Sequence, residues 1–190
     1  MNNSLIIFDT DCLSCFLMID EMFILKQLYD KIIIPQQVYD EFDKRNTQHL
    51  KRKLDQLMKE HFIEKEDFEL ETPEYLNYKN LHEEKFEYTN EVTGKKKIFV
   101  IGKGEAAAII LAQKYNATIA SNNTRDVIQL VKRYNLNWMR TGAILHDAIN
   151  NNLLTIDEAS VLWTKMLKKG RYLNPKNFKD YKSTKEYFNQ

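Results

Sequence analysis

The sequence predicts a three-layer α/β fold in which a central, mainly parallel sheet is flanked by helices. Short, wholly apolar runs at residues 5–8 and 32–34 are typical of strands covered on both faces, and residues 118–121 form a weaker third run. Helical patterns separate these runs. Strands that alternate with helices in this way pair in parallel through right-handed crossovers.

The helices are predicted in chain order from the spacing of apolar residues. Residues 21–29 can form one apolar side, and a second helix begins at Pro35, whose fixed φ suits a first turn. Residues 104–116 form a helix whose centre is apolar all round and which therefore belongs inside the protein. Residues 124–134 supply a further helix with an apolar face.

Two stretches fall outside this alternation. Residues 60–91 contain eleven acidic residues against three lysines, and we interpret them as a helical insertion followed by a hairpin that turns at Thr93-Gly94. The C-terminal stretch begins with a capping box, Thr155-Ile-Asp-Glu158, which predicts a helix that ends at Gly170.

Length and composition limit the class of protein. Of the 190 residues, 43% are apolar and 29% are charged, so the chain is neither disordered by composition nor membrane-like. It contains no apolar run of about 18 residues and no basic leader, so we expect a cytoplasmic protein with no membrane partner. We assign residues 1–150 to one domain, with the insertion at about 46–100, and residues 151–190 to a C-terminal helix and basic extension packed on it.

Acidic residues follow the predicted elements at places that should converge. Asp9 ends the first strand, Asp126 lies just beyond the third, and Glu105 begins the apolar helix. The carboxyl ends of parallel strands meet at one edge of a sheet, where ligands bind. We therefore expect these three carboxylates in one crevice.

The helical wheel selects a fourth acid on the helix after the second strand. At about 100° per residue, Val38 and Phe42 define its buried side, with Glu41 on the flank of that side and Asp40 nearly opposite. Four carboxylates in one crevice repel one another unless cations bind, and oxygen ligands suit Mg²⁺ or Mn²⁺ rather than zinc. Such a site, with one or two ions, hydrolyses phosphodiesters. Each acid taken alone also fits a surface or capping role, so only their convergence favours a site.

Four stretches carry a resemblance to a known family, and they occur in its order and at its spacing. They are Ile6–Ser14, Ile34–Phe42, Gly104–Ile109 and Ala120–Asp126. Together they resemble the PIN-domain ribonucleases, especially the VapC-type toxins of toxin–antitoxin pairs, and residues 141–155 resemble the C-terminal helices of a PIN subfamily. The resemblance implies a PIN-like fold and RNA as substrate. It also allows an antitoxin protein or a second copy of the chain as a partner.

The resemblance also implies roles for individual residues. The implied catalytic quartet is Asp9, Glu41, Glu105 and Asp126. Asp9 is the central metal ligand and Asp126 a second ligand to the same ion, while Glu41 and Glu105 hold a second ion or orient water. The expected metal ligands are thus Asp9, Glu105 and Asp126. The side chains expected to orient these carboxylates or waters are Thr10, Asp11, Ser121, Asn122 and Asn123.

Other functions stay open. Glu105 replaces the commoner Asp of the family, and Asn122 and Asn123 stand where many relatives carry Asp. A catalytically weakened PIN-fold module that binds RNA or protein is therefore an alternative. Cys12 and Cys15 follow a strand and open a helix, as in thiol oxidoreductases, but the two acids nearby disfavour a thiolate.

The net charge of +1 conceals an uneven distribution along the chain. Residues 165–190 carry eight basic residues against two acidic ones, and the remaining residues are acidic overall. The interleaved aromatics Tyr172, Phe178, Tyr181 and Tyr187 suit single-stranded nucleic acid, unless they dock on the core instead. The expected RNA-binding residues are Arg125, Lys168, Lys169 and Arg171.

Overall fold

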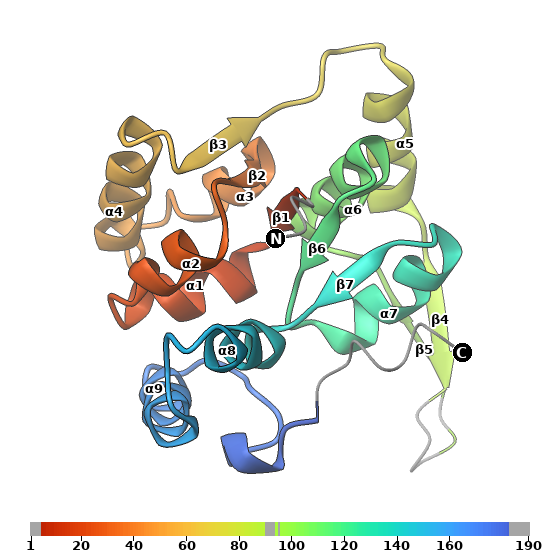
Figure 1. Cartoon of the computed structure of the whole chain (residues 1–190). Coiled ribbons are helices and arrows are strands. Elements are labelled where there is room, and N and C mark those ends of the chain that lie inside the picture. The colour runs from red at the N-terminus through yellow and green to blue at the C-terminus, as the bar shows by residue number, and fades with distance from the viewer. Residues whose placement is uncertain (1–4, 90–93, 95, 183–190) are drawn as a thin grey trace.

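A parallel sheet organises the chain, with its strands in the order β3-β2-β1-β6-β7 (Figure 1). The computed structural model describes residues 5–89, 94 and 96–182. Every neighbouring pair in this sheet is parallel, and Ile7 of the central strand pairs with Ile33 on one side and Ile119 on the other. The strands are β1 (Ile6–Phe8), β2 (Ile32–Pro35), β3 (Ile63–Glu66), β6 (Thr118–Ala120) and β7 (Asn137–Met139).

Alternate strand residues face opposite sides of the sheet and divide the apolar core in two. Ile6 and Phe8 join one core cluster, whereas Ile7 joins the other. Helices cover both faces, so the three-layer α/β prediction is confirmed (Figure 1). The first face carries α1 (Thr10–Met18), α2 (Met22–Leu28), α3 (Gln36–Glu41), α4 (Gln48–Lys59), α8 (Thr141–Asn150) and α9 (Ile156–Lys168); the second carries α5 (Pro73–Glu83), α6 (Lys103–Tyr115) and α7 (Thr124–Arg133).

The helix ends follow the signals in the sequence. Thr155 accepts a hydrogen bond from the backbone N–H of Glu158, and the Glu158 carboxylate accepts one from the N–H of Thr155, which is the predicted capping box of α9. Gly170, just beyond this helix, has a φ of +81°. The apolar helix α6 is buried along its centre and ends at Asn116, which has a left-handed conformation with a φ of 48°.

The prediction of a helical insertion over residues 60–91 is wrong for its first part. Residues 63–66 form β3, the edge strand that pairs with β2. Ile63 is buried, whereas Glu64 and Lys65 are exposed, so the strand lacks an apolar run. Charged residues are typical of edge strands, where they discourage pairing with other chains. The expected hairpin is formed by β4 (Phe86–Thr89) and β5 (Lys96–Phe99), but Thr93 of the predicted turn lies outside the described residues.

The C-terminal segment docks against α8 and α9 through aromatic rings. The rings of Phe178 and Tyr181 both lie near Trp163 of α9, with centroids at 5.5 and 5.7 Å, and both contact His146 of α8. Phe178, in a short 3₁₀ helix η1 (Phe178–Asp180), is 1% exposed and Tyr181 is 5% exposed. Two of the four aromatics considered for RNA binding are therefore core residues.

Gly142 permits this docking. A Cβ atom at this position would lie 2.5 Å from the ring of Tyr181. We expect Gly142→Ala to lower the free energy of unfolding by about 1–3 kcal/mol, because the buried ring must move. Urea denaturation measures the loss.

A double-mutant cycle with Tyr181→Ala tests the cause. If the clash is responsible, Gly142→Ala costs less in the Tyr181→Ala background, with a coupling of about 0.5–3 kcal/mol. Additive losses would contradict a direct contact between these two residues.

Candidate active site

Four connections leave the carboxyl ends of neighbouring parallel strands at one edge of the sheet. Asp9 follows β1, α3 with Glu41 follows β2, Ser121 follows β6, and Arg140 follows β7. Parallel strands place these connections together, and this edge is where ligands bind in open α/β sheets. The topology thus brings acidic, amide, hydroxyl and guanidinium groups to one region.

Asp9 is the buried centre of this edge. Its side chain is 2% exposed, and its Oδ1 accepts a hydrogen bond of 2.8 Å from the backbone N–H of Cys12, which makes Asp9 the N-cap of α1. The hydroxyl of Ser121 also bonds to this carboxylate. Asp9 therefore ties β1, α1 and the β6–α7 connection together.

Burial raises the pKa of Asp9 well above its usual value. The hydrogen bonds from Ser121 and Cys12 oppose this shift, and the charges of Asp11 and Glu105 add to it. Within the described part of the chain, no lysine or arginine pairs with Asp9. The carboxylate is thus desolvated and faces other acids, an arrangement that an external cation would stabilise.

Glu105 and Glu41 lie on adjoining helices, and the charge of Glu105 acts on Asp9. Glu105, in the first turn of α6, accepts hydrogen bonds from the N–H of Gly102 at 3.3 Å and from the amide of Asn123 at 2.5 Å. Glu41, at the end of α3, accepts one from the N–H of Gly104 at 3.3 Å. A Cβ at position 104 would lie 2.6 Å from Oε1 of Glu41, so the glycine lets α3 and α6 approach.

The β6–α7 connection is held by hydrogen bonds to distant residues. Both ends of the Asn122 amide bond to Thr141 at the start of α8, with Nδ2 donating to Oγ1 at 2.9 Å and Oδ1 accepting from the N–H at 3.0 Å. The Ser121 hydroxyl accepts from the N–H of Asn123 at 3.2 Å. Asn123 thus orients Glu105, and Ser121 orients Asp9. Asn122 instead binds the start of α8. No sequence pattern indicates this role of Thr141.

The other predicted site residues lie around this centre in different ways. Thr10 has a buried hydroxyl without a hydrogen-bond partner among the described atoms. Asp11 is exposed, and its Oδ1 lies 3.9 Å from Nη1 of Arg171, which also donates to the Ser14 hydroxyl at 2.9 Å. Lys168 and Lys169 are exposed at the end of α9.

Two predicted residues cannot be placed as side chains. Asp126 and Arg125 belong to the first turn of α7, but their side chains lie outside the described part of the structure. Within the part that is described, no three His, Cys, Asp or Glu side chains could hold one metal ion. Asp9, Glu41 and Glu105, the described members of the expected quartet, therefore do not form such a group by themselves.

The available donors fit a divalent cation of the hard type. Asp9, Glu105 and Thr10 offer oxygen atoms only, and the buried Asp9 carboxylate has no cationic partner among the described residues. Mg²⁺ and Mn²⁺ prefer such ligands, and Mg²⁺ commonly binds one or two carboxylates while keeping several waters. These residues would hold the ion at the carboxyl edge of the sheet.

The thiols of Cys12 and Cys15 belong to the core. Cys12 is fully buried and Cys15 is 1% exposed. Burial raises the pKa of both thiols, that of Cys15 to about 12, which suppresses the thiolate needed for disulfide exchange. The structure thus disfavours the thiol oxidoreductase alternative.

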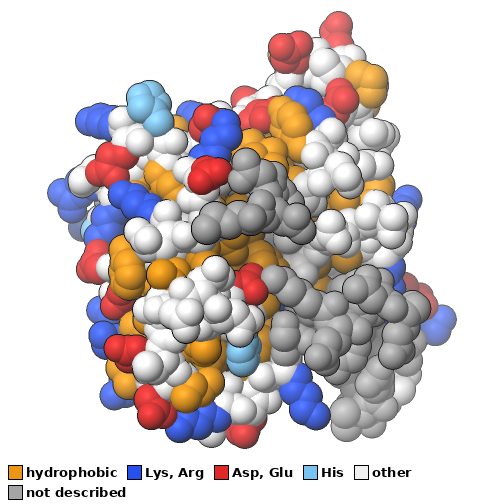
Figure 2. Space-filling model, in the orientation of Figure 1, with side chains coloured by type: hydrophobic (Ala, Val, Ile, Leu, Met, Phe, Trp, Pro, Cys, Tyr) orange, Lys and Arg blue, Asp and Glu red, His pale blue; other side chains and the backbone are white. Residues whose placement is uncertain are grey.

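Surface charge is mixed on the face shown in Figure 2, where Lys and Arg side chains lie among Asp and Glu side chains. No continuous basic coat covers the described part of this face. None of the described helices is long and apolar enough to cross a bilayer.

Fold and edge together define a three-layer α/β domain with acidic side chains at the carboxyl ends of its parallel strands. The family model for DUF3368, described as a PIN domain, matches residues 5–185. The chain belongs to this PIN-domain family, so the predicted family and PIN-like fold are confirmed.

One solved structure is similar over most of its length. It is a chain of the crystal structure of VapBC2 from Rickettsia felis bound to a DNA fragment from their promoter. The identity is 18% and the TM-score 0.49, with 72% of this chain and 98% of the other covered. A likeness this distant carries no inference about activity or partners. No curated protein matches the sequence.

Replacing Asp9 tests the cost of its burial. Because the pKa of Asp9 is higher in the folded than in the unfolded chain, its contribution to stability is complete at low pH and is lost as pH rises through the folded-state value. Asp9→Asn keeps an N-cap residue but cannot ionise. In a chelating buffer at pH 8, we expect a higher urea midpoint for Asp9→Asn than for the natural chain.

The difference should shrink as the pH falls toward about 4, because the folded-state carboxyl is then neutral and the unfolded-state carboxyl is about half protonated. Adding Mg²⁺ should stabilise the natural chain and leave Asp9→Asn unchanged, because only the former binds the ion. Equal midpoints at both pH values in chelator would contradict a charge cost at Asp9.

Proposed function

We propose that this chain is a Mg²⁺- or Mn²⁺-dependent endoribonuclease that hydrolyses phosphodiester bonds of RNA. The observation that carries the proposal is the buried Asp9 carboxylate, which lies beside Glu105 at the carboxyl edge of a parallel sheet. Membership of the PIN-domain family supports it, because PIN domains are generally nucleases that use divalent metals.

Each side chain has a part in the proposed reaction. Asp9 and Glu105 would hold the cation, with Asp126 as a further ligand predicted from the sequence. The bound ion would supply positive charge at the phosphate and lower the pKa of the attacking water. Glu41, whose carboxylate accepts a hydrogen bond from the N–H of Gly104, would orient water from the flank. Ser121 and Asn123 fix the orientation of Asp9 and Glu105 and thereby limit their motion during the reaction.

A PIN-fold module that binds without cleaving is the second candidate. It is favoured by Asn123, whose amide donates to Glu105 where many relatives have a carboxylate. An amide leaves less negative charge around the ion. This candidate predicts retained RNA or protein binding without metal-dependent hydrolysis.

A cleavage assay decides between the two. With end-labelled single-stranded RNA and Mg²⁺ or Mn²⁺, we expect Asp9→Asn to lower the rate at least about 100-fold, because a metal ion contributes several kcal/mol to catalysis. Glu105→Gln should also reduce the rate strongly. Chelation should abolish cleavage by the natural chain.

Asp40→Asn is the matched control. Asp40 is exposed and adjoins Glu41 on the same helix, but its carboxylate accepts from Gln36 and lies away from Gly104. The control variant should cleave at the natural rate. Cleavage by Asp9→Asn at that rate would refute the proposed site, and absence of cleavage by a folded natural chain would favour the binding module.

An antitoxin partner forms a separate part of the proposal and is supported by the sequence resemblance to VapC-type toxins. We expect a small open reading frame directly beside the gene, whose product co-purifies with this chain and suppresses its cleavage of RNA. An isolated gene, or a neighbouring product that does not bind, would remove this part and leave the nuclease proposal intact. Homodimer formation stays a prediction.

A further inference from the structure

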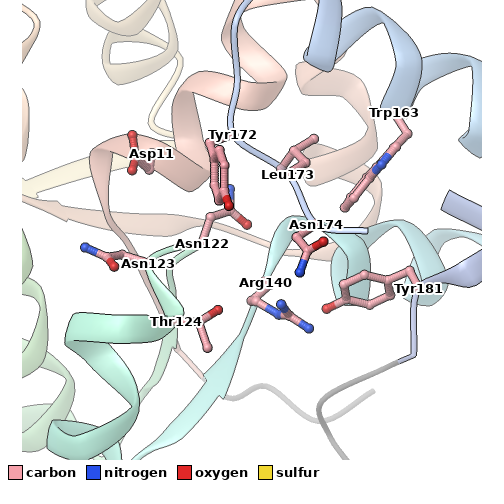
Figure 3. Close-up of a pocket in the computed structure, with 10 residues that line it drawn as sticks. All are labelled: Asp11, Asn122, Asn123, Thr124, Arg140, Trp163, Tyr172, Leu173, Asn174 and Tyr181. Atoms are coloured by element: carbon pink, nitrogen blue, oxygen red, sulfur yellow. The ribbon is translucent and has the colours of Figure 1, made fainter. Parts of the chain in front are cut away.

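A cavity of about 590 Å³ adjoins the acidic edge and uses residues from five parts of the chain. Its volume falls within the roughly 300–1,000 Å³ typical of small-ligand sites. Figure 3 shows Asp11 and Asn123 at one end, Tyr172 and Asn122 in the middle, and Trp163 with Tyr181 at the other end. Asn123 donates a hydrogen bond to Glu105, so the first end adjoins the acids. The remaining lining residues are Thr124, Arg140, Leu173 and Asn174.

Arg140 gives this cavity a fixed positive charge. Its guanidinium lies over the ring of Tyr181 at 4.9 Å and near that of Trp138 at 5.8 Å, so the two rings hold it in place. Its Nε is buried without a hydrogen-bond acceptor in the described part of the structure. No carboxylate of that part forms an ion pair with it.

The start of α8 adds to the positive potential. Arg140 is the N-cap of this helix, and the described first turn of α8 contains no acidic residue. Helix N-termini attract anions because their free N–H groups and the helix dipole point outward. A guanidinium whose Nε has no partner among the described residues suits a phosphate at such a position, because an arginine can bind a phosphate through two hydrogen bonds.

Tyr172 supplies an aromatic surface beside the same cavity. Its side chain is 83% exposed, although the neighbouring Leu173 is 2% exposed and anchors the segment in the core. Lys176 lies 5.1 Å from the centre of the ring. An exposed ring at an anchored position is available for stacking with a base, and such stacking is the usual way in which proteins hold single-stranded nucleic acid.

We propose that this cavity is a nucleotide subsite, in which Arg140 binds a phosphate of the RNA chain and Tyr172 stacks on the attached base. The proposal deepens the proposed function and rests on it for the identity of the ligand as RNA. The acids would act on one phosphodiester bond while the cavity holds a neighbouring nucleotide. Asn174 is exposed and also lines the cavity, where its amide would be available to the polar edge of that base.

Binding in a chelating buffer tests the subsite apart from catalysis. The probe is a fluorescein-labelled uridine hexanucleotide, which stays intact without metal, and the protein is the full chain. We expect Tyr172→Ala to weaken binding about 5- to 100-fold through the loss of stacking, and Tyr172→Phe to bind within about twofold of the natural chain. Phe23→Ala is the matched control, since Phe23 is 49% exposed on α2, outside the cavity.

The salt dependence distinguishes the two contacts. Arg140→Gln should weaken binding and reduce the slope of log K against log salt by about 0.7, the value for one phosphate contact on a single strand. Tyr172→Ala should leave this slope unchanged. 5′-UMP should displace the hexanucleotide at lower concentrations than uridine or inorganic phosphate, because only the nucleotide makes both contacts.

Three results would overturn the proposal. They are equal affinity of Tyr172→Ala and the natural chain, an unchanged salt slope for Arg140→Gln in a folded protein, and displacement of the probe by a polyglutamate peptide more readily than by 5′-UMP. The last result would assign the cavity to an acidic peptide.

The subsite and the proposed function can be refuted separately. If the binding results are as expected but the natural chain cleaves no RNA, the subsite is supported and the nuclease proposal is refuted. If cleavage depends on Asp9 but RNA binding is unaffected by the Tyr172 and Arg140 substitutions, the nuclease proposal is supported and the subsite is refuted.

Discussion

The Asp9 carboxylate links three segments at the carboxyl edge of the sheet by hydrogen bonds. It ends β1, caps α1 through the N–H of Cys12, and bonds to Ser121 after β6. An asparagine would cap the helix as well and would avoid the desolvation of a charge. The local structure therefore does not explain why this position is acidic. The cation-binding role proposed for Asp9 would explain it, because the same burial that penalises the free carboxylate strengthens its attraction for an ion.

The rest of the edge is held by polar links between segments far apart in the sequence. The N–H of Gly104 fixes Glu41, the amide of Asn123 fixes Glu105, and the amide of Asn122 fastens the same connection to α8. Each link satisfies a backbone or side-chain group that would otherwise be costly to bury. The side chains at this edge are thus held in place by hydrogen bonds from other groups, an arrangement that would give the proposed catalytic residues a fixed orientation.

The sequence predicts those parts of the fold that depend on apolar pattern. The strands β1, β2 and β6 and the helices α6, α7 and α9 lie where their patterns place them. The strands β3 and β7 were missed because each is only partly apolar, and β3 carries charges at the edge of the sheet. The missed strand β7 is the one that delivers Arg140, so the cavity beyond the acids could not be predicted.

Side-chain roles were harder to predict because they depend on partners distant in the sequence. Asn122 was expected to orient carboxylates, but its amide is bonded at both ends to Thr141. The neighbouring Asn123 does contact Glu105. Two adjacent asparagines with the same expected role thus have different hydrogen-bond partners. The positions of α6 and α8 decide which asparagine contacts Glu105 and which contacts Thr141. Asp126 stays a prediction, since its side chain is not described.

The basic C-terminal segment has a role in the architecture that its charge does not suggest. Phe178 and Tyr181 are buried against α8 and α9, and Arg171 reaches α1, so much of the segment is fixed to the body. Tyr181 in turn supports Arg140, which makes the orientation of that guanidinium depend on the docked segment. The segment therefore completes the wall of the cavity beside the acidic edge. Removing residues 151–190 would expose the core face of α8 and would remove this wall, so the extension contributes to the cavity as well as to the fold.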